Sequence, residues 1–161
     1  MAFRPKKKVL DQDVKRAIIA NSVTLTVGDL VQPAATGHNK FITPAATTGL
    51  ILGVVVAIEQ DGKVCEKTSV TTGASNESTV VYRAVYIPSY IDMEYEADLS
   101  AAAGTTSNSD GLCFLSLGSG TPGTLDETSV ALFGGTAGQV WSYGPTATST
   151  TKVNCHIYKT L

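Results

Sequence analysis

Short segments of β-branched or alternating apolar residues recur along this chain, and a turn signal separates each from the next. Residues 22–27 alternate polar and apolar side chains, whereas residues 50–58 are continuously apolar. The dipeptide Asp61-Gly62 is a strong signal for a tight hairpin. About ten such segments, spaced by roughly 8–12 residues, are typical of a sandwich or a barrel. The sequence therefore predicts an all-β fold, with a β-sandwich or a β-tulip or barrel-like body.

The beginning of the chain differs from the rest in charge. Residues 1–16 hold six basic and two acidic side chains, whereas the remainder holds six basic and twelve acidic ones. This uneven distribution of charge predicts an extended N-terminal arm over residues 1–20 and one β-rich domain over residues 21–161. Apolar side chains within residues 9–20 recur at helical spacing, so a short helix also fits there. The arm is either a solvated terminus or a segment that docks on an acidic surface.

Four carboxylates alternate with apolar residues in one later segment: Asp92, Glu94, Glu96 and Asp98. Alternate residues of a strand share a face, so the four would line up about 7 Å apart and repel one another. A solvated outer face is the simplest interpretation. The functional interpretation is a docking track for a basic arm, such as residues 4–8 of an adjacent copy, and a calcium site is a third.

The three cysteines are Cys65, Cys113 and Cys155. Their number is odd and no pair has the CxxC spacing of metal or redox motifs. Each lies among apolar or β-prone residues, so we expect buried, inert thiols, which suit a reducing cytoplasm.

Catalytic chemistry has little support in the sequence. His38 and His156 are far apart, and His156 and Cys155 would face opposite sides of one strand. The glycine-rich segment 118–123 lacks the Gly-Lys-Ser/Thr ending of a phosphate-binding loop. The apolar run 50–58 is too short to cross a bilayer. We therefore expect no catalytic residue, cofactor, metal site or membrane contact, and we do not expect an enzyme.

Several segments, taken in order, resemble the capsid decoration (cement) and head stabilisation proteins of tailed bacteriophages. Residues 23–29, Val-Thr-Leu-Thr-Val-Gly-Asp, are similar to the family's opening strand and turn. Residues 41–45 and 49–56 are similar to its next pair of strands, including an apolar Leu-Gly-Val-Val core, and residues 152–157 fit its closing strand. The resemblance is one of pattern and covers residues 21–158, and the chain is longer than the simplest members.

The resemblance implies a virion protein, made in the bacterial host cytoplasm, that lies on the outer surface of an icosahedral capsid. It implies the major capsid protein as partner and self-association, with a homotrimer favoured, and it transfers no catalytic residue. Nucleic acid is not expected as a main partner, because no basic patch outside the arm would add to its contacts with phosphates. The candidate interface residues are Phe3, Arg4, Lys6, Lys7, Lys8, Lys15, Arg16, Asp92, Glu94, Glu96 and Asp98.

A carbohydrate-binding or adhesion module on a virion or cell surface is the alternative function. Sugar-binding sandwiches present exposed aromatic side chains, and Trp141 and Tyr143 share one face of a predicted strand. Packing in the core is the competing interpretation for this pair.

Overall fold

A computed structural model describes residues 3–35, 41–45, 51–76, 80–98, 113–117, 125–131, 140–145 and 152–157. For residues 113–117, 125–131, 140–145 and Val153 the description covers the backbone alone. The described residues are almost all β, as predicted, and they hold one short 3-10 turn and no α-helix.

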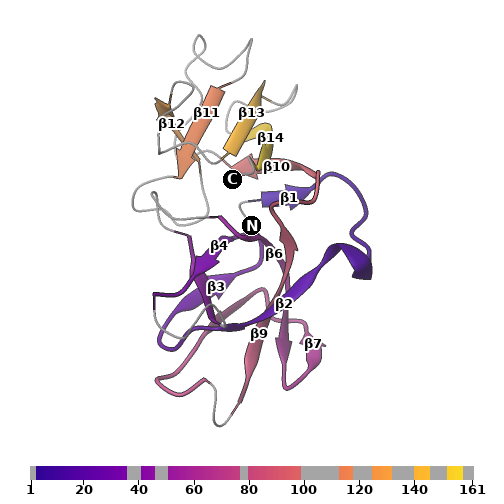
Figure 1. Ribbon diagram of the computed structural model, residues 1–161, viewed down its shortest axis with the longest axis vertical. Coiled ribbons are helices and arrows are strands. Elements are labelled where there is room, and N and C mark those ends of the chain that lie inside the picture. The colour runs from indigo at the N-terminus through magenta and orange to yellow at the C-terminus, as the bar shows by residue number, and fades with distance from the viewer. Residues whose placement is uncertain are drawn as a thin grey trace.

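The lower part of the molecule is a closed five-stranded barrel (Figure 1). Its strand order is β4-β5-β2-β9-β6, and pairing of Leu30 with Val54 and of Val31 with Gly53 closes the ring between β4 and β6. The β2–β5 pair is parallel and the other neighbours are antiparallel. The barrel strands are β2 (Lys15–Ile19), β4 (Leu30–Pro33), β5 (Phe41–Pro44), β6 (Gly53–Gln60) and β9 (Tyr82–Pro88).

The predicted hairpin at Asp61-Gly62 is confirmed. It joins β6 to β7 (Lys63–Cys65), and Gln60 pairs with Lys63 across the turn. The φ angles of Asp61 and Gly62 are 50° and 82°. Two successive positive φ values match the right-handed twist of the flanking strands, which is why Asp-Gly is favoured in this turn.

A second sheet lies above the barrel in Figure 1, in the order β1-β10-β14-β13-β11-β12, with every pair antiparallel. A two-stranded ribbon, β3 with β8, buries Leu25 and Val70 against the barrel core. These strands are β1 (Phe3–Pro5), β3 (Thr24–Thr26), β8 (Ser69–Thr71), β10 (Glu94–Asp98), β11 (Cys113–Leu117), β12 (Leu125–Ala131), β13 (Val140–Pro145) and β14 (Lys152–Ile157).

One hydrophobic cluster joins the barrel to the second sheet. Phe3 of β1 and Tyr95 of β10 pack edge to face, with ring centroids 6.4 Å apart. Barrel side chains such as Val54 and Ile87 belong to the same cluster, as does Cys155 of β14. Burial of apolar surface is the main contribution to folding stability. The shared cluster therefore packs β1, β10 and β14 of the second sheet against the barrel as one body.

The N-terminal segment corrects two expectations. Residues 9–20 form no α-helix: they contain a 3-10 turn, η1 (Asp11–Asp13), followed by β2, which lies between β5 and β9 in the barrel. The described part of the predicted arm, residues 3–20, is therefore not separate from the body, since β1 and β2 are both strands of it. A short isolated helix is only marginally stable in water. Strand pairing along both edges of β2 is more favourable and therefore overrides the helical spacing of the apolar residues.

Candidate interface

The N-terminal strand β1 runs antiparallel to β10. Phe3 lies opposite Ala97, Arg4 opposite Glu96 and Pro5 opposite Tyr95. Two backbone bonds hold its ends: the Phe3 N–H donates to the Gly28 carbonyl at 3.1 Å, and the Lys6 N–H donates to the Glu94 carbonyl at 2.9 Å. This register places the Arg4 side chain on the face of the sheet that carries the acidic residues.

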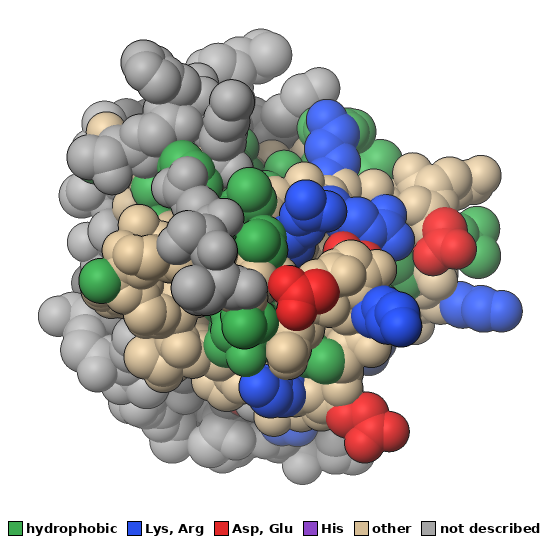
Figure 2. All heavy atoms as spheres, turned by 90° about the horizontal axis from the view of Figure 1, so that it is seen from below, with side chains coloured by type: hydrophobic (Ala, Val, Ile, Leu, Met, Phe, Trp, Pro, Cys, Tyr) green, Lys and Arg blue, Asp and Glu red, His purple; other side chains and the backbone are tan. Residues whose placement is uncertain are grey.

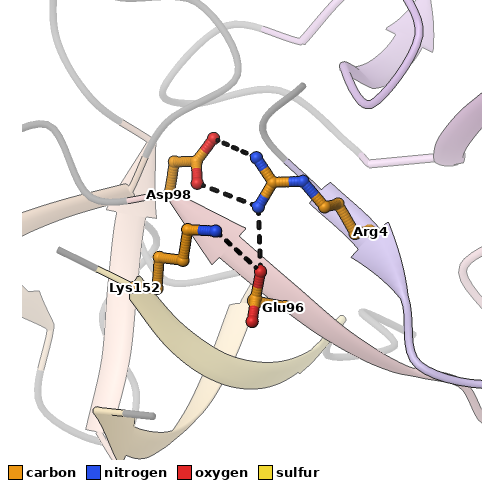
Figure 3. Close-up of polar contacts among 4 residues, drawn as sticks. All are labelled: Arg4, Glu96, Asp98 and Lys152. Carbon is orange, nitrogen blue, oxygen red and sulfur yellow. Dashed lines mark hydrogen bonds and ion pairs between the residues drawn. The ribbon is translucent and has the colours of Figure 1, made fainter. Parts of the chain in front are cut away.

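Arg4 bridges two of the four predicted carboxylates (Figure 3). Its Nη1 donates to Glu96 Oε1 at 2.9 Å and to Asp98 Oδ1 at 3.1 Å, and its Nη2 donates to Asp98 Oδ2 at 3.1 Å. From the other side, Lys152 Nζ on β14 donates to Glu96 Oε1 at 3.0 Å. The planar guanidinium can bind in this two-pronged way because its N–H donors form a fixed fork.

These cations change the protonation of Glu96. The hydrogen bond from Lys152, followed by that from Arg4, lowers the pKa of the Glu96 carboxyl below its usual value. Farther along the same face, His156 Nδ1 lies 2.9 Å from Asp92 Oδ1, although the Asp92 side chain is 93% exposed. Two of the carboxylates that would repel one another, those of Glu96 and Asp98, are thus paired with cations of β1 and β14.

The alternation predicted for the acidic residues is confirmed within β10. Glu94, Glu96 and Asp98 are half-buried on one face, while Tyr95 and Ala97 are buried on the other. The pairing of a basic N-terminal segment with this track is also present, but both belong to one chain. Arg4 occupies the position that was predicted for the arm of an adjacent copy.

Two further candidate cations contact side chains of the barrel. Arg16 Nε donates to Glu59 Oε1 at 2.7 Å, and this contact raises the pKa of Arg16. The Lys15 ammonium lies 5.0 Å from the centre of the Tyr90 ring, and hydrogen bonding to Tyr90 raises the pKa of Lys15. Lys and Arg side chains gather toward the right of the barrel end shown in Figure 2, with Asp and Glu among them.

The prediction that Phe3 belongs to an interaction surface is wrong for this structure. Its side chain is fully buried, with 0% exposure, because it packs in the cluster between the two sheets. An aromatic ring in that position stabilises the fold.

Lys6, Lys7 and Lys8 are solvent-facing candidates without a side-chain partner within the described part of the chain. All three are exposed, and none forms an ion pair with another described residue. Beside them lies an open groove of about 400 Å³ between residues 5–9 and the barrel. The groove could not be predicted from the sequence, because the residues that form its two walls lie far apart along the chain.

Two described cysteines and one buried carboxyl group make contacts within the fold. Burial raises the pKa of the Cys155 thiol, which keeps it protonated and unreactive. Asp29 is buried, which raises its pKa, but its Oδ2 accepts a hydrogen bond from the Thr26 N–H at 2.8 Å and closes a turn. Cys65 is half-buried, and its Sγ donates to the Ile58 carbonyl.

Several predictions fall outside the described part of the chain. His38 and the glycine-rich segment 118–123 are not described, and neither are the side chains of Cys113, Trp141 and Tyr143. Within the described residues, no cluster of three or more His, Cys, Asp or Glu side chains could hold a metal ion. The same residues contain no helix long and apolar enough to cross a membrane.

Comparisons with known proteins found no matching family model, no matching curated protein and no matching solved structure.

Proposed function

We propose that this protein is a structural virion protein that binds the outer surface of an icosahedral phage capsid and stabilises the shell by bridging major capsid protein subunits. The observation that carries the proposal is the exposed lysine segment 6–8 beside an apolar groove. Unpaired cations next to apolar surface suit a protein partner, because charge steers the encounter and apolar burial supplies affinity.

The location of the resembling segments supports the same proposal. Residues 23–29, 41–45 and 49–56, which resemble decoration proteins, contain strands β3 and β5 and the start of β6. The barrel wall of the groove, formed by Val27, Val55 and Val56, therefore lies within the resembling segments, whereas the lysine segment 6–8 precedes them.

The physics of a shell makes such a binder useful. Packed DNA presses outward on the capsid, and a protein that contacts two neighbouring subunits raises the cost of separating them. Because a capsid repeats the same site many times, modest contacts add up through multivalency. A hydrophobic cluster shared by the barrel and the second sheet suits this role, because close-packed interiors transmit strain.

Co-sedimentation of the purified protein with capsids that lack it tests the proposal. We expect saturable binding at a fixed number of copies per shell, and binding that weakens as salt rises because the lysines contribute. Truncating residues 1–20 is no suitable control, since it would remove barrel strand β2. Absence of saturable binding would refute the proposal.

A further inference from the structure

We infer that the groove beside residues 6–8 receives an extended segment of a capsid subunit, one that carries apolar side chains flanked by Asp or Glu. This inference rests on the proposed function and specifies the chemistry of the partner at the proposed surface. Three properties of the groove support it: its lining, its unpaired backbone groups and its charge.

The lining of the groove is apolar. Pro5 and Val9 form the wall on the N-terminal side, and Val27, Val55 and Val56 form the barrel side. Val56 is the additional residue at the register shift between Val55 and Ala57, where β6 is irregular against β9. A β-bulge re-aims the side chains around it, and such bulges are frequent next to functional sites.

The groove also borders free backbone groups. Residues 7–9 follow β1 but make no backbone hydrogen bond to any other described residue. An extended peptide laid along them could pair with their N–H and C=O groups, as a strand added to a sheet edge does. A lipid tail or an apolar small molecule would leave those groups unpaired, so a peptide fits better.

The charge of the lysines beside the groove indicates which residues the bound peptide should contain. Lys7 lines the groove, Lys6 and Lys8 adjoin it, and all three are exposed. Arg4, in contrast, already holds Glu96 and Asp98 and offers no free charge. Acidic side chains next to the apolar residues would therefore complement the unpaired cations.

Shell-binding measurements on matched variants test this inference. Lys7→Glu reverses a groove charge, and Lys63→Glu reverses an exposed charge on the β6–β7 hairpin. Val56→Thr adds a hydroxyl to the groove, whereas Val64→Thr makes the same change at a side chain that is 65% exposed. All four positions lie at or near the surface, so we expect the variants to fold, which melting temperatures would verify.

We expect Lys7→Glu and Val56→Thr to weaken shell binding by about tenfold, which corresponds to about 1.4 kcal/mol, and both controls to bind within about twofold of the unmodified protein. Bound shells should also slow amide hydrogen exchange in residues 7–9. Equal binding by all variants, with unchanged exchange, would overturn the groove assignment and leave the proposed function standing. No binding by the unmodified protein would overturn both.

Discussion

At the scale of single residues, Arg4 links the N-terminal strand β1 to the acidic face of β10. One guanidinium spans Glu96 and Asp98, and Lys152 approaches Glu96 from the neighbouring strand. Like charges that face each other on a sheet destabilise it, so these contacts relieve a local repulsion. The acidic face thereby becomes the site where the N-terminal strand attaches.

The protonation of Glu96 should make this attachment sensitive to acid. Because the folded-state pKa lies below the ordinary value of 4.5, the carboxylate contributes stability above that value and loses it as pH falls through the lowered pKa. Glu96→Gln should therefore lower the free energy of unfolding at pH 7, by at most about 1 kcal/mol because the pair is partly exposed. The difference between the two proteins should therefore be smaller at pH 3 than at pH 7.

Urea denaturation at both pH values measures this effect. Glu66→Gln is the control, because Glu66 is exposed and forms no ion pair with a described residue. A difference of the same size at pH 7 and pH 3 would show that the carboxylate charge is not responsible.

At the scale of elements, β1 is short but is anchored by a buried aromatic side chain. Phe3→Ala should destabilise the protein by about 3 kcal/mol, because it removes a large side chain from the cluster between the sheets. Leu10→Ala, at a side chain that is 46% exposed, should change the free energy of unfolding by less than about 0.5 kcal/mol. Equal losses in chemical denaturation would contradict the assignment of β1 to the body.

Close approach of β6 to β9 gives a second prediction at this scale. A Cβ on Gly53 would collide with the Ile87 carbonyl oxygen and lie 2.8 Å from its carbonyl carbon. These are backbone atoms, so no rotamer change relieves the overlap, and Gly53→Ala should cost about 3 kcal/mol or prevent folding.

Gly73→Ala is the matched control for this substitution, since nothing lies within 4 Å of a Cβ at Gly73. Melting temperatures of the two variants measure the effect. Similar melting temperatures would mean that β6 and β9 are not packed as closely as described.

Elements with a local pattern could be predicted from the sequence, and those defined by distant contacts could not. The Asp61-Gly62 turn and the alternation of Glu94, Glu96 and Asp98 depend on neighbouring residues, and both were predicted. The spacing of apolar residues within 9–20 also fits a short helix, and strand β2 leaves no local signal against it because its pairing with β5 and β9 is with distant segments. The contact of Arg4 with Glu96, 92 residues away, required the register of β1 on β10.

At the scale of the whole molecule, the two sheets share a core, and within the described residues Lys6, Lys7 and Lys8 are exposed beside an apolar groove and form no ion pair. Glu96 and Asp98 of the acidic face pair with Arg4 and Lys152 of the same chain, and these pairs help to hold β1 and β14 beside β10. The free cations and the apolar groove are left for a partner. We therefore propose that residues 5–9 and the barrel wall beside them form the surface that contacts a capsid subunit.

Electron cryomicroscopy of capsids with and without the added protein tests the proposed function most directly. We predict additional density on the outer surface, repeated at symmetry-related positions, with each copy contacting at least two capsid subunits. In that density the lysine segment 6–8 should face the shell. Shells without ordered outer density after incubation at saturating protein concentration would contradict the proposal that this chain is a capsid decoration protein.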